Sequence, residues 1–321
     1  MNILVTGGAG FIGSHTCEAL LKKKYKVLCV DNLDNYYNPK FKLENLKILK
    51  KYKNFHFIKA DITKKSKLNN IFRKNKIDKI IHLAARTGVR ASIEHTHLYE
   101  SVDIKGTIHL LDLTRKHRVK QFIFGSSSSV YGINKKIPFS ESDKIDKPIS
   151  PYAACKAAGE LFCFTYHHLY NIPITILRFF TVYGPRGRPD MAVYKFTEQI
   201  SKDKEIFIYG DGNSQRDYTY ITDIIKGIMK ALENKFEYEI FDLGESRTVK
   251  LKYLISLIEK NLGKKVKIKY MLAQPGDVPI TYANILKAKK MLGYKPKVKI
   301  EEGIKKFIKW YKENRAGVKS K

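Results

Sequence analysis

The segment Ile3–His15 reads ILVTGGAGFIGSH and places Gly7, Gly10 and Gly13 between an apolar, strand-like run and an amphipathic, helix-like run. In this spacing the first glycine permits a tight turn and the second lets a pyrophosphate approach the backbone. The third lets the helix pack closely on the strand, and the helix N-terminus favours a phosphate. The segment therefore predicts a dinucleotide-binding turn. The residues expected to contact the cofactor here are Gly7, Gly10, Phe11, Ile12 and Gly13.

An acidic residue follows at the distance that such a turn requires. Asp31 ends the next apolar run, KVLCVD, eighteen residues after Gly13. A carboxylate at this position accepts hydrogen bonds from the adenosine ribose hydroxyls and repels a 2′-phosphate. A glycine triplet alone also occurs in simple turns, but here strand, helix and acid occur together. The pattern predicts NAD, rather than NADP, as the cofactor.

The rest of the chain indicates a doubly wound α/β fold. From Asn2 to about Gly125, continuous apolar runs alternate with helix-like segments. Continuous runs are typical of strands that are buried on both faces, as in a parallel sheet covered by helices. After Gly184 the elements become shorter and are separated by Pro and Gly. We expect a Rossmann-type domain over residues 1–184, to which later segments return, and a smaller α/β lobe over 185–321.

The composition is unusual in its charge. The 321 residues carry a formal net charge of +30, with 61 Lys and Arg against 31 Asp and Glu. Such an excess can serve nucleic-acid binding. However, the lysine pairs are scattered along the chain, and we find no basic tail and no nucleic-acid-binding motif. We therefore expect a lysine-rich solvated surface that attracts anionic small molecules, and no nucleic-acid partner.

Several other features exclude classes of protein. No apolar run approaches the roughly 18 residues that a membrane span needs, and the N-terminus does not resemble an export signal. We expect a cytoplasmic protein without a membrane partner. The four cysteines show no metal-ligand or redox-motif spacing, so we expect buried, reduced thiols and no metal site.

The segment SPYAACKAAGE, residues 150–160, contains a candidate proton-transfer pair. Tyr152 and Lys156 are four residues apart and lie on one face of a helix. A phenol with the usual pKa of about 10 is a poor base at neutral pH. A nearby ammonium group and a nicotinamide cation would favour the phenolate. A run of serines, SSSSVYG from Ser126, precedes this pair.

Together with DI at Asp61–Ile62, HLAA at 82–85 and RDYTYITDI from Arg216, these motifs resemble the extended short-chain dehydrogenase/reductase family over nearly the whole chain. The resemblance implies that Tyr152 and Lys156 are catalytic and that Lys156 also holds the nicotinamide ribose. Ser127 would share the proton of the substrate hydroxyl. The further cofactor contacts that it implies are Asn32, Asp61, Ile62, Leu83, Ala84 and Ala85.

The serines bear on the type of reaction. Relatives that dehydrate sugar nucleotides carry Asp-Glu between the catalytic Thr and Val-Tyr-Gly, and relatives that decarboxylate UDP-glucuronate carry a Glu. This chain has Ser128 and Ser129 at these positions. Neither can supply a carboxylate for eliminating water. The resemblance then implies epimerisation at the fourth carbon of a sugar through a transient 4-keto sugar.

Four segments, starting at Asp31, His82, Arg178 and Gln274, resemble the UDP-glucuronate 4-epimerase branch of the family. The expected activity is the NAD-dependent interconversion of UDP-glucuronate and UDP-galacturonate, with the UDP-sugar bound mainly by residues 185–321. Thr181 replaces the Asn that is common in UDP-glucose and N-acetylhexosamine epimerases. The implied substrate contacts are Ser127, Ser128, Ser129 and Thr181 for the carboxylate, Arg188 and Arg216 for the diphosphate, Asp277 for the ribose, and Arg90 as a further anion contact.

Two alternatives remain open at this point. One is a UDP-glucose or UDP-N-acetylglucosamine 4-epimerase of the same fold, and the other is a non-catalytic nucleic-acid-binding protein. Three residues depart from the family pattern: Asp103 stands where Asn is usual, and Arg86 and Thr87 stand where Gln and Ala are common. The resemblance also implies a homodimer that pairs the helices expected over 98–116 and 151–170.

Overall fold

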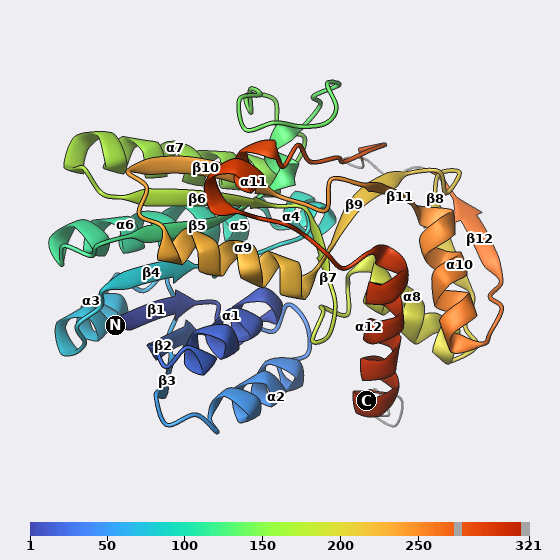
Figure 1. The fold of residues 1–321 in the computed structure, drawn as a ribbon, viewed down its shortest axis with the longest axis horizontal. Helices are drawn as coiled ribbons and strands as arrows, with labels where there is room; N and C mark the ends of the chain where they lie inside the picture. Colours follow the sequence, from blue (N-terminus) through green and yellow to red (C-terminus); the bar gives the residue numbers. More distant parts are fainter. Residues whose placement is uncertain (273–277, 316–321) are drawn as a thin grey trace.

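The computed structural model describes residues 1–272 and 278–315 (Figure 1). Its main sheet is parallel and has the strand order β10-β6-β5-β4-β1-β2-β3. The strands are β1 (Asn2–Thr6), β2 (Lys26–Asp31), β3 (Phe55–Lys59), β4 (Lys79–His82), β5 (Phe122–Ser127), β6 (Ile174–Phe179) and β10 (Tyr238–Leu243). The strand order reverses between β1 and β4, and this crevice is where open α/β sheets bind ligands. The predicted Rossmann-type fold is confirmed.

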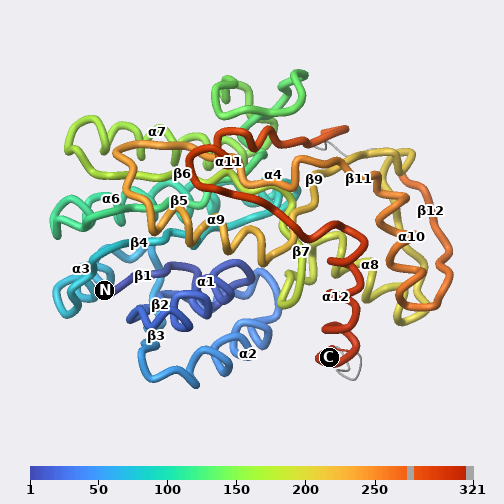
Figure 2. Tube along the Cα trace, viewed as in Figure 1, coloured from blue at the N-terminus to red at the C-terminus, as the bar shows by residue number. Residues whose placement is uncertain are grey.

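Helices cover both faces of this sheet, as Figures 1 and 2 show. One face carries α1 (Phe11–Lys22), α2 (Lys40–Leu49) and α9 (Ile221–Glu233), and the other carries α3 (Lys65–Lys74), α6 (Gly106–Lys116) and α7 (Pro151–Tyr170). Successive strand residues pack into the hydrophobic cores on opposite faces of the sheet. Val5 packs against the face that carries α1, and Leu4 packs against the face that carries α6. Burial on both faces explains the continuous apolar runs of the sequence.

A smaller lobe follows β6 and lies at the right of Figure 1. Its two small sheets contain β7 (Thr181–Tyr183), β9 (Gln215–Tyr220) and β11 (Thr248–Lys250), and β8 (Ile206–Tyr209) and β12 (Ile268–Met271). Its helices are α8 (Ala192–Ser201), α10 (Leu251–Leu262) and α12 (Ile300–Asn314). The chain also returns to the main sheet after residue 184: β10 forms its edge beside β6, and α11 (Leu286–Leu292) packs on β10.

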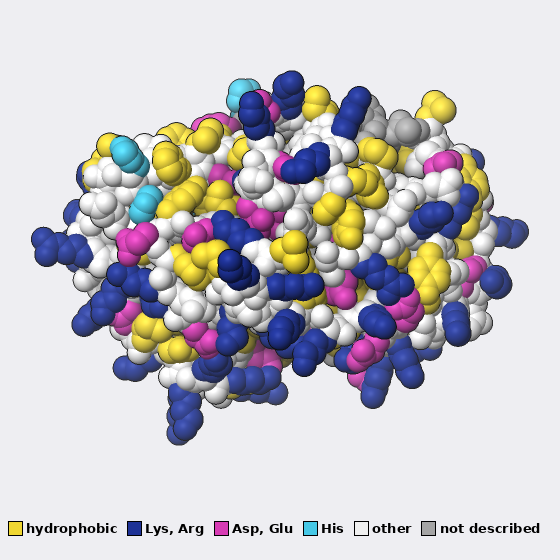
Figure 3. Space-filling view, turned by 45° about the horizontal axis from the view of Figure 1, so that its top comes forward, with side chains coloured by type: hydrophobic (Ala, Val, Ile, Leu, Met, Phe, Trp, Pro, Cys, Tyr) yellow, Lys and Arg dark blue, Asp and Glu magenta, His cyan; other side chains and the backbone are white. Residues whose placement is uncertain are grey.

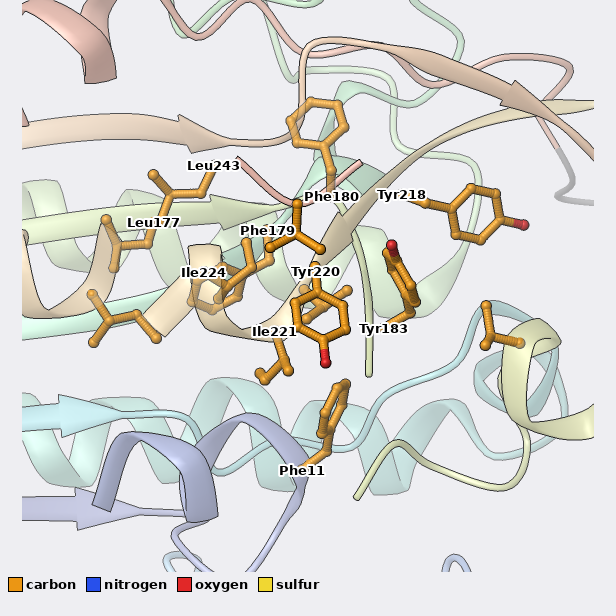
Figure 4. Packing of buried hydrophobic residues seen from close by; sticks show 14 of the residues in the cluster. Phe11, Leu177, Phe179, Phe180, Tyr183, Tyr218, Tyr220, Ile221, Ile224 and Leu243 are labelled. Atoms are coloured by element: carbon orange, nitrogen blue, oxygen red, sulfur yellow. The ribbon is translucent and has the colours of Figure 1, made fainter. Parts of the chain in front are cut away.

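Aromatic and aliphatic side chains join the lobe to the start of α1 (Figure 4). Phe11, at the first position of α1, lies below Tyr220 of β9. The rings of Tyr183 and Tyr220 meet edge to face, with centroids 5.4 Å apart. Gly184 has φ +141°, and a Cβ there would lie 2.5 Å from Ile221. The lobe is therefore packed tightly beside the glycine-rich turn.

The helix expected over 98–116 is interrupted. The chain forms α4 (Val89–Glu94), α5 (Thr96–Tyr99), a π-helical turn η1 (Glu100–Lys105) and then α6. Short π-turns occur frequently at functional sites because they redirect side chains. Here the turn places Asp103 in the interior, where only 2% of its surface is exposed. The apolar periodicity of the segment did not reveal this change of helical pitch.

On the face shown in Figure 3, Lys and Arg side chains are dispersed and alternate with acidic ones. Ion pairs such as that of Lys202 with Glu198, at 2.6 Å, involve a minority of the Lys and Arg side chains in the described part of the chain. The absence of a nucleic-acid partner stays a prediction, and this dispersed arrangement agrees with it. Within residues 1–272 and 278–315, no helix combines the length and the apolar character needed to cross a membrane.

Candidate active site

The glycine-rich turn fits a dinucleotide. Gly7 has φ +69°, and a Cβ there would lie 2.7 Å from the Ala84 nitrogen. A Cβ at Gly13 would collide with the Gly7 carbonyl. Helix α1 begins directly after Gly10, and no side chain of the described residues caps it. Its first N–H groups can therefore bind a phosphate, as the spacing predicts.

The other predicted cofactor residues lie at the carboxyl ends of neighbouring strands. The buried Asp31 carboxylate accepts hydrogen bonds from the Ala9 and Leu33 amides at 3.1 and 2.8 Å. The Asn32 amide donates to Asp61 at 3.1 Å. Burial alone would raise the pKa of Asp61, but hydrogen bonds from Thr63 and Asn32 hold this pKa below its ordinary value. Ile62 follows Asp61, and residues 83–85 follow β4 directly. These predicted cofactor residues thus lie at one edge of the sheet, at or directly after the ends of β2, β3 and β4.

The predicted catalytic residues meet at the start of α7. Ser150 caps this helix by accepting a hydrogen bond from the Ala153 amide at 3.1 Å. Lys156, which is 4% exposed, donates to the Gly125 carbonyl at 2.9 Å. Ser127, at the end of β5, lies close enough to the Tyr152 hydroxyl to lower its pKa. The structure therefore brings Ser127, Tyr152 and Lys156 together across the β5–α7 interface.

Without a bound cofactor, the surroundings of Tyr152 disfavour its phenolate form. Burial raises the pKa of Tyr152 to about 12, although the nearby Ser127 lowers it. The negative charge of Asp103 also raises this pKa. Burial lowers the pKa of Lys156. The positive charge of bound NAD+ would shift the balance toward the phenolate.

Asp103 is a buried carboxyl group beside this pair. Its Oδ1 accepts a hydrogen bond from the Arg86 amide at 2.6 Å, and its Oδ2 finds no partner among the described residues. Burial raises the pKa of Asp103 to about 7, while the Lys156 and Arg86 charges oppose this shift. The turn η1 packs directly against α7. Burial thus brings the pKa of Asp103 near neutrality, and its charge acts on both predicted catalytic side chains.

We expect Asp103→Asn to shift the acid limb of the pH–rate profile to lower pH. The ionised carboxylate raises the pKa of Tyr152, so an uncharged amide should lower that pKa. The difference from the wild type should be greatest above about pH 7, where Asp103 is ionised. The measurement is kcat/KM between about pH 5.5 and 9.5. The exposed control Asp146→Asn should keep the wild-type profile. An unchanged midpoint in Asp103→Asn would show that Asp103 does not affect Tyr152.

The serine segment forms a short 3₁₀ turn, η2 (Ser128–Tyr131), after β5. Ser127 accepts from the Ser129 amide at 3.2 Å, and the Ser127 and Ser129 hydroxyls are 3.1 Å apart. In the sheet Ser127 pairs with Phe179, two residues before Thr181. The serine turn and the start of β7 thus follow neighbouring strands of the main sheet.

The other predicted substrate residues lie at different places in the structure. Thr181 and Arg188 line one small cavity beside Phe11. Arg216 lies on β9, two residues before Tyr218, the residue that pairs with Thr181. Arg90, on α4, stacks on the Tyr209 ring at 4.3 Å. Asp277 and the Gln274–Asp277 motif lie outside the described residues, so the structure does not place them.

A buried polar network behind the serines was missed by the sequence reasoning. The Arg178 guanidinium binds Glu160 with contacts of 2.6 and 2.9 Å and donates to the Tyr131 hydroxyl at 2.9 Å. Tyr131 donates to Asp242 at 2.6 Å, and Ser126 donates to Glu160 at 2.5 Å. The network fixes the end of β5 from α7, β6 and β10. The motifs around Tyr131 and Arg178 were noted, but their spacing gave no sign of this contact.

Comparison with known proteins places the chain in a family. The model of the GDP-mannose 4,6 dehydratase family matches residues 4–307. The chain belongs to the extended short-chain dehydrogenase/reductase family. A UDP-glucuronate 4-epimerase of Thermodesulfobacterium geofontis is 45% identical over 318 residues, which cover 99% of this chain and 98% of that protein.

Two solved structures extend the comparison. The UDP-glucuronic acid 4-epimerase of Bacillus cereus, in complex with UDP-glucuronic acid and NAD, has a TM-score of 0.91 and 40% identity, covering 98% of this chain and 99% of that chain. The UDP-glucose 4-epimerase of Thermotoga maritima, with UDP-glucose, has a TM-score of 0.90 and 34% identity. The match covers 98% of this chain and 99% of that chain. The predictions of an NAD-dependent sugar-nucleotide epimerase and of its family are confirmed at this level.

Proposed function

We propose that the protein interconverts UDP-glucuronate and UDP-galacturonate through a 4-keto sugar. The observation that carries the proposal is the serine turn beside Tyr152. Ser127 and Ser129 bring hydroxyl groups to the proposed reaction centre, and Ser128 and Ser129 stand where dehydratases of the family have carboxylates. The 45% identical UDP-glucuronate 4-epimerase supports the same sugar.

In this proposal the chain's own groups move one proton and hold the sugar. Tyr152 takes the proton of the sugar's fourth hydroxyl and later returns it, with Ser127 sharing the hydrogen bond. The glycine-rich turn, Asp31 and Lys156 would hold NAD+, which would supply a reversible hydride acceptor for the hydrogen of the fourth carbon. Lys156 stabilises the phenolate by its positive charge. The cofactor is unchanged after a full cycle.

The substrate carboxylate must be protected from decarboxylation in this reaction. Oxidation of glucuronate at the fourth carbon creates a β-keto acid, which loses carbon dioxide easily when the carboxylate stands perpendicular to the carbonyl. We assign Thr181 and Ser127–Ser129 to hydrogen bonds that hold the carboxylate near the carbonyl plane. The breaking bond then lacks orbital overlap with the ketone, so the carboxylate is retained.

Thr181→Val tests this assignment. Valine keeps the size and shape of threonine but cannot donate a hydrogen bond. We expect the fraction of decarboxylated pentose nucleotide to rise, or the KM for UDP-glucuronate to rise about tenfold, since a charge-assisted hydrogen bond is lost. Products and carbon dioxide are measured together. Thr165→Val, on the exposed side of α7, is the matched control. If neither quantity changes, Thr181 does not hold the carboxylate.

The diphosphate and uridine contacts remain part of the proposal. We assign Arg188 and Arg216 to the diphosphate, Arg90 to a further anion contact and Asp277 to the ribose. Arg188 donates to Asp190 at 3.0 Å and to the Thr87 hydroxyl. A bound diphosphate would compete with Asp190 for this guanidinium. In this division, residues 1–184 with their returning segments hold NAD, and residues 185–321 mainly hold the UDP-sugar.

A paired assay decides the sugar. Purified protein is incubated separately with UDP-glucuronate and UDP-glucose, products are resolved by chromatography, and carbon dioxide is monitored. We expect UDP-galacturonate from the first and no comparable turnover of the second. Inversion of UDP-glucose with UDP-glucuronate untouched would instead identify a neutral-hexose epimerase, such as the Thermotoga maritima enzyme.

We also propose a cytoplasmic homodimer. Helix α7 exposes Leu161, Phe164 and Leu169, with 64%, 51% and 59% of their surfaces accessible. A second copy could cover these side chains by pairing α7 and the neighbouring α6 across a two-fold axis. Light scattering coupled to gel filtration should give twice the chain mass of 37.1 kDa. A mass of one chain would overturn the dimer.

A further inference from the structure

Two loops flank the glycine-rich turn and touch each other. In the sheet β1 lies between β4 and β2, so the loops after β4 and β2 stand on opposite sides of the turn that follows β1. Arg86, in the loop after β4, donates to Asp34, in the loop after β2, at 2.8 Å. The side chains are 15% and 30% exposed. This ion pair connects the loop after β4 with the loop after β2.

Tyr36 strengthens the connection. The Arg86 guanidinium lies 5.4 Å from the centre of its ring, and the Arg188 guanidinium lies 5.5 Å from it. Cations at this distance are attracted by an aromatic face. Gly88 allows the close approach: it has φ +105°, and a Cβ there would lie 2.5 Å from the Tyr36 hydroxyl. The contact thus involves both loops and one arginine of the lobe.

The backbone holds Arg86 in place for this contact. Asp103 accepts a hydrogen bond from the Arg86 amide at 2.6 Å, and the neighbouring Thr87 accepts one from Arg188. The three residues that depart from the family pattern, Arg86, Thr87 and Asp103, therefore belong to one connected group.

We propose that the Asp34–Arg86 ion pair is a clasp that retains the bound dinucleotide. A cofactor seated on the glycine-rich turn lies between the two loops that this pair joins, so its release requires them to separate. Breaking a charge-assisted hydrogen bond is then part of the barrier to release. This role suits an enzyme that keeps one NAD through many cycles. This proposal concerns the cofactor site alone, so it does not depend on which sugar is the substrate.

The test measures cofactor release without any sugar. Wild-type protein, Asp34→Asn, Arg86→Gln and the double variant are loaded with NADH, and the decay of bound-NADH fluorescence is followed after adding excess NAD+. Asp34→Asn keeps the oxygen that accepts from both the Tyr36 amide and Arg86 at 2.8 Å, so it removes only the negative charge of the pair. Arg86→Gln keeps the backbone bond to Asp103. The loops should therefore remain folded. We expect each single variant to release NADH about five- to tenfold faster, and the double variant to be no faster than either.

Lys287→Gln is the control, because it breaks an ion pair of 2.6 Å with Glu239 on the remote edge strand β10. It should release NADH at the wild-type rate. Wild-type rates in both Asp34→Asn and Arg86→Gln would overturn the clasp, as would faster release in only one of them. A strictly multiplicative effect in the double variant would also overturn it, since the two residues would then act independently. Failure of UDP-glucuronate turnover leaves this measurement unaffected, so the two proposals fail separately.

Discussion

Tyr152→Phe should lower kcat by about a thousandfold, because it removes the only hydroxyl that we assign to proton transfer at the sugar. The ring stays, so its edge-to-face contact with Tyr99, at 6.3 Å between centroids, is kept. Ser127 alone cannot substitute, since its hydroxyl lacks a neighbouring base. The measurement is the initial rate of product formation at saturating UDP-sugar, together with the NAD content of the purified variant.

The NAD content separates chemistry from binding. We expect the variant to contain as much NAD as the wild type, because Lys156 and the glycine-rich turn are unchanged. Tyr170→Phe, at the other end of the same helix, should keep the wild-type kcat. Full activity in Tyr152→Phe would remove the proposed proton transfer from the account.

Arg178→Met should destabilise the protein by about 3–5 kcal/mol, the usual cost of removing one partner from a buried ion pair. Arg178 and Glu160 are 2% and 3% exposed. Methionine would leave the Glu160 charge without compensation and would remove one partner of the Tyr131 hydroxyl. The measurement is the urea concentration at the midpoint of unfolding.

Two further variants identify the cause. Arg178→Met combined with Glu160→Gln should recover part of the loss, because no uncompensated charge then remains. Lys65→Met breaks an exposed pair with Asp112, 2.9 Å long, and should cost less than about 1 kcal/mol. An Arg178→Met protein that unfolds at the wild-type midpoint would show that the buried pair is not needed for stability. The same network supports Ser126, so the variant should also lower activity.

Local spacing was sufficient to predict the tight glycine turn and the helix that carries Tyr152 and Lys156, whose cofactor-binding and catalytic roles stay predictions. Gly7 and Gly13 act within one turn, and Tyr152 and Lys156 lie one helical turn apart, so a few residues contain the whole signal. The main parallel sheet could be predicted for the same reason, because each of its strands is a continuous apolar run. These parts of the fold need no knowledge of distant contacts.

Contacts between distant segments could not be predicted in this way. Tyr131 and Asp242 are 111 residues apart, and Arg86 and Asp34 are 52 apart. Their meeting depends on strand order, which the periodicity does not specify. The π-turn that buries Asp103 was hidden because its apolar pattern resembles that of an ordinary helix. The raised pKa of Tyr152 was missed because burial of a helix residue depends on what packs above it.

The central claim is that hydrogen leaves and rejoins the fourth carbon of a UDP-uronate while the carboxylate is kept. It is tested most directly with UDP-glucuronate that carries deuterium at this carbon, incubated with purified protein in ordinary water. The account predicts UDP-galacturonate that retains its deuterium at the fourth carbon, without release of carbon dioxide. Product that has lost the deuterium to solvent, or a pentose nucleotide formed with carbon dioxide, would contradict it.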